Sequence, residues 1–169
     1  MPRSLTRRAL LFGRASATPE PRAFRPPWAR RPEQEFSAAC TRCDACIRQC
    51  PQQVLVRDTN GLPRFDPQTG ECTFCGECVS ACASGAFDSS LSPPWTLLAS
   101  IDSICLSARG IVCASCREIC PASAIHVPPA ARGTALVDTS RCTGCGACVA
   151  VCPVDAIRLQ HATPRETVA

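Results

Sequence analysis

The sixteen cysteines of this 169-residue chain lie in four dense groups, and their spacing limits the possible folds more than any other feature. In three groups, two, two and three residues separate successive cysteines, whereas in the remaining group seven residues separate the first two. The quartets are Cys40, Cys43, Cys46 and Cys50; Cys72, Cys75, Cys78 and Cys82; Cys105, Cys113, Cys116 and Cys120; and Cys142, Cys145, Cys148 and Cys152. Because no cysteine lies outside these quartets, the fold has to bring the thiols together in small sets.

The regular spacing is typical of bacterial ferredoxins, in which such a run of cysteines binds a [4Fe–4S] cluster. Proline follows the fourth cysteine of three quartets and ends a helical turn there, while Ala83 takes this place in the second quartet. We therefore predict four [4Fe–4S] clusters held by all sixteen cysteines. The count falls to three if the stretched quartet that begins at Cys105 is degenerate.

In two-cluster ferredoxins the fourth cysteine of each run ligates the other cluster. This rule predicts four mixed ligand sets: Cys40, Cys43, Cys46 with Cys82; Cys72, Cys75, Cys78 with Cys50; Cys105, Cys113, Cys116 with Cys152; and Cys142, Cys145, Cys148 with Cys120. Each pair of quartets is then stapled by its own clusters, so cluster loss should unfold it.

A high cysteine content also occurs in zinc-binding proteins and in disulfide-linked proteins. Zinc ribbons also contain closely spaced cysteine pairs, but they use two pairs for each metal ion rather than runs of four. Cysteine-rich secreted chains form disulfide frameworks, whose cysteines are scattered rather than grouped. Both alternatives fit the spacing less well than iron–sulfur ligation does.

The N-terminal stretch lacks the long apolar region of a secretory signal, because only Ala9–Phe12 follows Arg7 and Arg8 before Gly13. No uncharged apolar stretch approaches the roughly 18 residues that span a membrane. We therefore expect a cytoplasmic protein in a reducing compartment, without a membrane span.

The charge of the chain is unevenly distributed. Residues 1–39 contain eight arginines and three glutamates, whereas the remainder contains ten arginines and eleven acidic residues. Each [4Fe–4S] core with four thiolates adds about −2 to that remainder. We expect an acidic body with a basic arm, which favours docking to a basic partner surface and argues against nucleic-acid binding.

The expected fold class is α+β, with tandem bacterial two-cluster ferredoxin-like modules made of short hairpins and helical turns. The prolines and arginines at the start of the chain favour an irregular basic arm without a packed core. The predicted divisions are a basic Pro-rich arm at 1–36, a first cluster module at 37–88, a connector at 89–104, a second cluster module at 105–160 and a tail at 161–169.

Short apolar runs beside turn residues predict the strands. We expect one hairpin of 54–56 with 62–65 around Asn60 and Gly61, a second of 125–127 with 135–137, and a last strand at 157–159. In the connector, Trp95, Leu98 and Ile101 lie at helical spacing after Ser92, so we expect a short helix there. Trp28 and Trp95 should pack against the modules, and His126 and His161 should lie at the surface.

The sequence contains no paired carboxylates, nucleophile–base set, phosphate-binding loop or dinucleotide-binding motif. We therefore expect that the protein is not an enzyme and that its chemistry belongs to the cysteine quartets.

A combination of motifs, rather than the generic quartets, points to a family. The motifs are Thr6–Leu11 with Gly13 and Arg14, Arg25-Pro26-Pro27-Trp28, Cys40–Cys46 and the seven-residue gap between Cys105 and Cys113. In this combination the chain resembles the ferredoxin-type accessory proteins of periplasmic nitrate reductase systems, the NapF type, over residues 4 to 160.

This resemblance implies a cytoplasmic, non-exported protein that binds the precursor of the molybdenum-containing catalytic subunit of periplasmic nitrate reductase. The implied role is to assist maturation of that subunit at its own iron–sulfur cluster before twin-arginine export. The N-terminal arm is then a partner-binding segment, a solvated basic arm or an export-like signal, and the sequence leaves these three alternatives open.

A second functional class is an electron carrier, or a wire subunit that passes single electrons between redox partners. A third hypothesis is redox regulation through loss of a labile cluster at the stretched quartet. The sequence does not separate these roles, and it leaves the oligomeric state open.

Overall fold

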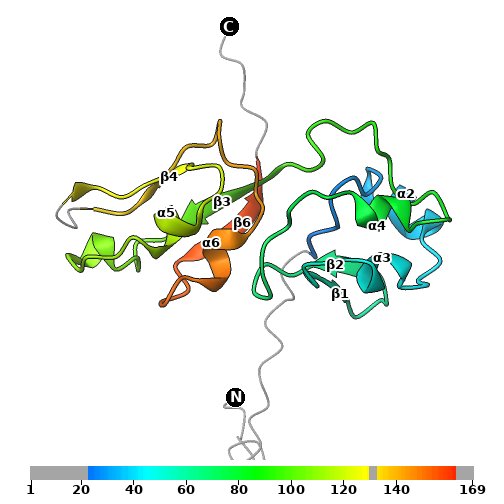
Figure 1. Cartoon of the computed structure of the whole chain (residues 1–169), viewed down its shortest axis with the longest axis horizontal. Helices are drawn as coiled ribbons and strands as arrows, with labels where there is room; N and C mark the ends of the chain where they lie inside the picture. Colours follow the sequence, from blue (N-terminus) through cyan, green and yellow to red (C-terminus); the bar gives the residue numbers. More distant parts are fainter. Residues whose placement is uncertain (1–22, 130–132, 163–169) are drawn as a thin grey trace, which may run out of the picture.

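The structure is a computed structural model, and it describes residues 23–129 and 133–162. Its elements are short and are joined by long loops (Figure 1). The helices are α2 Glu33–Ala39, α3 Ala45–Arg48, α4 Glu77–Ser80, α5 Ser115–Ile119 and α6 Ala147–Ala150, with a 3-10 turn η1 at Ser107–Arg109. The strands are β1 Leu55–Arg57, β2 Pro63–Phe65, β3 Leu97–Ile101, β4 Ile125–His126, β5 Leu136–Val137 and β6 Ile157–His161.

These elements form two halves that lie side by side (Figure 1). The first half contains α2, α3 and α4 with strands β1 and β2, and the second contains α5 and α6 with strands β3 to β6. This small mixed fold of helices and strands fits a ferredoxin-like iron–sulfur protein. Within the described residues, no helix is long and apolar enough to cross a membrane.

Both predicted hairpins are confirmed. Strand β1 pairs with β2 in antiparallel register, with Leu55 opposite Phe65, and β4 pairs with β5, with Ile125 opposite Val137. In the first turn, the Asp58 carboxylate accepts hydrogen bonds from the backbone N–H groups of Asn60 and Leu62. This local bonding fixes the turn and directs Phe65 into the core, where it is fully buried.

The predicted connector helix is wrong. Residues 97–101 form strand β3, which pairs antiparallel with β6, with Ala99 opposite Leu159 and Ile101 opposite Ile157. Burial along β3 alternates: Leu97 and Ala99 are buried, whereas the residues between and after them are only half-buried. Burial therefore repeats every two residues, as in a strand, rather than every 3.6 residues, as in a helix. Strand β3, from the predicted connector, thus forms a sheet with β6, at the end of the predicted second module.

The expectation of an unpacked arm is wrong for residues 23–36. Helix α2 begins inside this range, Phe36 is 0 % exposed, and Pro26 and Pro27 are each less than 2 % exposed. The Arg25 guanidinium forms ion pairs with Glu33 and Asp58, at 2.7 and 2.8 Å. The prolines favour an extended backbone in this segment. Because its apolar side chains are buried, however, the segment packs against the first half instead of extending into solvent.

The predictions for residues 1–22, including Arg7 and Arg8, lie outside the described residues, as does the tail from 163 onward. The two tryptophans pack as expected. Trp95 is 6 % exposed, and its ring contacts Phe65 and Phe74 with centroids 5.0 and 5.3 Å apart. Trp28 packs edge-on against Phe74, at 6.3 Å.

Candidate metal centres

Four cavities in the structure are each lined by four cysteines. The first outer cavity is lined by Cys40, Cys43, Cys46 and Cys82; the first inner cavity by Cys50, Cys72, Cys75 and Cys78; the second inner cavity by Cys120, Cys142, Cys145 and Cys148; and the second outer cavity by Cys105, Cys113, Cys116 and Cys152. Every set takes three cysteines from one quartet and the fourth from another. The structure thus brings together the same four mixed sets that the sequence predicts as ligands.

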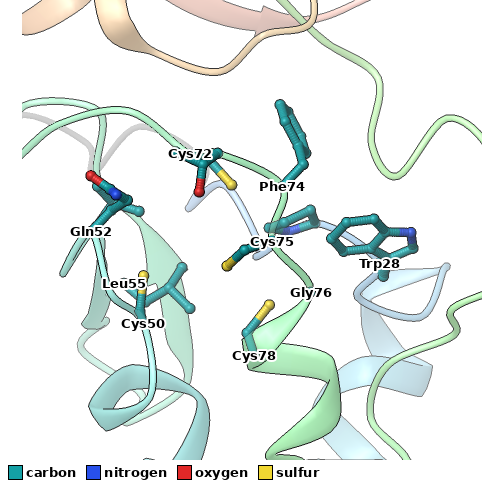
Figure 2. A pocket seen from close by; sticks show the side chains of 12 residues that line it. Trp28, Cys50, Gln52, Leu55, Cys72, Phe74, Cys75, Gly76 and Cys78 are labelled. Atoms are coloured by element: carbon teal, nitrogen blue, oxygen red, sulfur yellow. The ribbon is translucent and has the colours of Figure 1, made fainter.

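Figure 2 shows this arrangement in the first inner cavity, where the side chains of Cys50, Cys72, Cys75 and Cys78 lie around one space. Trp28 lies on the far side of Cys75 from Cys50. The docked segment 23–36 therefore contributes an aromatic wall to a cysteine-lined site of the first half.

A left-handed residue positions the third cysteine in three of the quartets. Asp44, Gly76 and Gly146 have φ values of 60°, 80° and 88°, and they precede helices α3, α4 and α6. This reversal starts a helix whose first turn buries the third cysteine at the cavity wall. In the stretched quartet the same position is Ala114, with φ −135°, so helix α5 begins from a different backbone conformation.

The seven-residue gap of the stretched quartet is spanned by η1 and a turn at Gly110, where the N–H groups of Arg109 and Ile111 both donate to the Leu106 carbonyl. The gap does not reduce the cavity. The second outer cavity and the first outer cavity each enclose a volume of about 20 Å³. The stretched quartet therefore closes a site of the same size as a regular one.

Burial dominates the acid–base properties of the third cysteines. It raises the pKa of Cys46 to about 11 and the pKa of Cys78 and Cys148 to about 12, and neighbouring cysteines in the same cavities add to the effect. Burial likewise raises the pKa of Cys116. Free thiols at these positions are protonated at neutral pH, so binding of a metal group here has to release protons.

Backbone N–H groups point at the fourth cysteines. Ala124 donates to the Cys120 sulfur at 3.3 Å, and Ala156 donates to the Cys152 sulfur at 3.2 Å. For Cys82, burial acts to raise the pKa, but hydrogen bonds from the Ser84 hydroxyl and nearby backbone N–H groups outweigh it and lower the pKa. Donors of this kind favour thiolate sulfur and tune the potential of an iron–sulfur site.

The first cysteine of the last quartet has a partner that the sequence analysis missed. The N–H group of Ala99, in strand β3, lies 3.5 Å from the Cys142 sulfur. A helical connector would not have placed this donor, so the wrong prediction for 97–101 also hid this contact. The repeated spacing of an alanine four residues after Cys120 and Cys152 is the sequence signal for the other two donors.

The donor sets fit a [4Fe–4S] cluster better than a single ion. Across the described ranges, no three Cys, His, Asp or Glu side chains converge on one metal-ion position. A cubane cluster instead takes one thiolate at each of four separate irons. His126 and His161 are exposed, as expected, and line none of the four cavities.

Comparison with protein families agrees with this fit. Residues 39–87 match the model of the 4Fe-4S dicluster domain, and residues 135–158 match that of the 4Fe-4S binding domain. The first range includes both quartets of the first half, and the second range includes the last quartet.

The chain is also similar to characterised relatives along most of its length. It is 35 % identical over 128 residues to the ferredoxin-type protein NapF of Escherichia coli, covering 76 % of each chain. It is 40 % identical over 123 residues to NapF of Haemophilus influenzae, covering 72 % of this chain and 69 % of that protein. The methylamine utilization ferredoxin-type protein MauM of Methylophilus methylotrophus is 34 % identical over 162 residues, covering 79 % of this chain and 70 % of MauM.

Proposed function

This chain belongs to the NapF family of ferredoxin-type proteins, and from that premise we propose that it holds four [4Fe–4S] clusters in two tandem two-cluster modules. The observation that supports this most strongly is the composition of the cavities. Each of the four contains four cysteines in the mixed set that two-cluster ferredoxins use.

A [4Fe–4S] group bound in such a cavity accepts and releases single electrons. The residues of this chain hold and shield it. The cysteine thiolates are the ligands, the N–H groups of Ala124, Ala156 and Ala99 stabilise sulfur charge, and Trp28 and Phe74 exclude water at the first inner cavity. The proposal includes no catalytic residue.

The proposed role is assistance in the maturation of the periplasmic nitrate reductase catalytic subunit, whose precursor this protein would bind in the cytoplasm before export. The support is family membership together with the arginine-rich residues 1–39. In this role the protein supplies electrons or a cluster to the iron–sulfur site of the precursor.

The second outer cavity offers a contact surface for such a partner. Ile111 and Val112 are 51 % and 87 % exposed, and Val112 directly precedes Cys113 of that cavity. Ile111 and Val112 are adjacent in the chain, and contiguous exposed apolar side chains are typical of protein–protein contact sites. The precursor is therefore proposed to dock at the stretched loop, close to the cluster that this loop helps to hold.

The maturation role is tested with the catalytic subunit produced in cells that lack this protein. The proposal predicts a subunit with fewer irons and lower activity than the subunit from the complemented strain. A full iron content and full activity in the deletion strain would overturn it. Anaerobic co-purification with the tagged precursor, with iron counted in both proteins, measures the complex directly.

The second candidate is an electron carrier or wire subunit, and it is favoured by the contact between the two inner cavities described below. Rapid and reversible reduction by an isolated redox partner, without any effect on the iron content of the precursor, would support this role over maturation. Both roles require the same four cysteine-lined sites.

A further inference from the structure

The two inner cavities meet where the halves of the molecule touch. The backbone N–H of Cys72 donates a hydrogen bond of 2.8 Å to the carbonyl of Cys145. Cys72 lines the first inner cavity, and Cys145 lines the second. The loops that carry the two sites are therefore in direct contact, although 73 positions separate the two residues in the numbering.

Trp95 forms a second bridge between the same two cavities. Its Nε1–H donates to the carbonyl of Thr143 at 2.8 Å, and its ring packs edge-on against Phe74 at a centroid distance of 5.3 Å. Thr143 lines the second inner cavity, and Phe74 lines the first. A single buried indole thus contacts the walls of both sites.

Gly146 shows how closely the halves approach each other. A Cβ atom at this position would lie 2.8 Å from Cζ of Phe65 and 3.0 Å from Cβ of Pro67, both in the first half. Gly76 occupies the corresponding place in the second quartet with nearly the same backbone conformation, yet a Cβ atom there would meet nothing within 4 Å. Glycine at 146 is thus needed for the contact as well as for the turn.

We propose that this contact is an electron-exchange junction, so that the two modules work as one chain of four redox centres rather than as two separate ferredoxins. The inference rests on the proposed function, because it requires clusters in both inner cavities. One electron passes across the junction: the group on one side is oxidised as the group on the other is reduced, and no proton or atom moves. The contacts that Cys72, Cys145 and Trp95 make keep the two inner clusters close together. The rate of electron exchange depends steeply on the distance between these clusters.

The test uses the full chain, purified anaerobically, with iron and sulfide counted before the protein is reduced by dithionite. Electron paramagnetic resonance then measures the spin–spin interaction between reduced clusters. Gly146→Ala should reduce the inter-module interaction several-fold because the methyl group separates the halves. Gly76→Ala is the matched control: it carries the same backbone strain at the same helix position, and the interaction should persist.

A double variant tests the physical cause. Phe65→Leu removes the ring atoms nearest to position 146, so Gly146→Ala combined with Phe65→Leu should recover part of the interaction. If Gly146→Ala loses the iron of its own cavity, Trp95→Phe decides instead. It removes the hydrogen bond to Thr143 and part of the ring that packs against Phe74, and it should weaken the interaction at full iron content.

The outcomes separate this inference from the proposed function. An iron content too low for four clusters in the wild-type protein contradicts the proposed function. A full iron content with equal spin–spin interaction in the wild type, Gly146→Ala and Trp95→Phe overturns the junction and leaves the four-cluster proposal standing.

Discussion

The two halves of the molecule surround similar pairs of cysteine-lined cavities in different ways. The first half is covered by residues 23–39, which bury Phe36 and place Trp28 beside the first inner cavity. The second half gains strand β3 instead, and it carries all of the large exposed apolar side chains in the described part of the chain: Ile111, Val112, Ile119, Leu136 and Val151.

The difference shows that the cysteine spacing determines the sites but not their surroundings. Residues 23–39 cover the first half, which favours a structural role for this segment. The apolar side chains exposed on the second half favour contact with another protein. The four predictions below test this contrast, beginning with the sites that the two halves share.

The largest effects should come from the fourth cysteines of the second half. Cys120→Ser should damage the second inner cluster, whose other ligands are Cys142, Cys145 and Cys148. Cys152→Ser should instead damage the second outer cluster. Iron content and the electron paramagnetic resonance spectrum of each variant, compared with the wild type, measure the loss. An intact second inner cluster in Cys120→Ser would show that the mixed sets are wrong.

Phe36→Ala tests whether the docked segment stabilises the first half. This side chain is fully buried and packs edge-on against Phe87, at 5.8 Å. Its truncation should cost about 3–5 kcal/mol of unfolding free energy. Denaturant unfolding followed by cluster absorbance measures the change, with Val112→Ala as a control at an exposed site. Equal stability of the two variants would mean that the segment does not hold the first half together.

Arg25→Met tests the ionic part of the same contact. The variant leaves the buried Asp58 carboxylate without its arginine partner, although Asp58 keeps its hydrogen bonds from Asn60 and Leu62. The expected loss is about 1–3 kcal/mol. The double variant Arg25→Met with Asp58→Asn should recover part of the lost unfolding free energy. If it recovers none, the loss does not come from the ion pair between Arg25 and Asp58.

Val112→Ser should have the smallest effect on stability, within about 0.5 kcal/mol, because the side chain is exposed. The same variant should nevertheless reduce co-purification with the catalytic-subunit precursor. Ile119→Ser is the matched control, since Ile119 is also exposed in the second half but neither it nor its neighbour Cys120 lines the second outer cavity. An equal reduction by both variants would argue against docking at the stretched loop.

Much of the site was accessible from the sequence. The four mixed cysteine sets follow from the spacing together with the rule that the fourth cysteine of each run ligates the other cluster in two-cluster ferredoxins. The first hairpin was predictable because its turn is local: Asp58, Asn60 and Gly61 form it through hydrogen bonds between near neighbours in the sequence.

The parts that could not be predicted depend on long-range contacts. The pairing of Leu97–Ile101 with Ile157–His161 joins distant segments, and the spacing of Trp95, Leu98 and Ile101 equally suits a helix. The docking of 23–36 depends on a surface formed by other residues, as the bridge between Ala29 and Phe87 shows. The contact of Cys72 with Cys145 exists only once both halves have folded.

The most direct test of the account is native mass spectrometry of the intact, anaerobically purified protein. The account predicts a mass increase that corresponds to four [4Fe–4S] clusters, one for each cysteine-lined cavity. A mass increase that corresponds to zinc ions, or to fewer than four clusters, would contradict it.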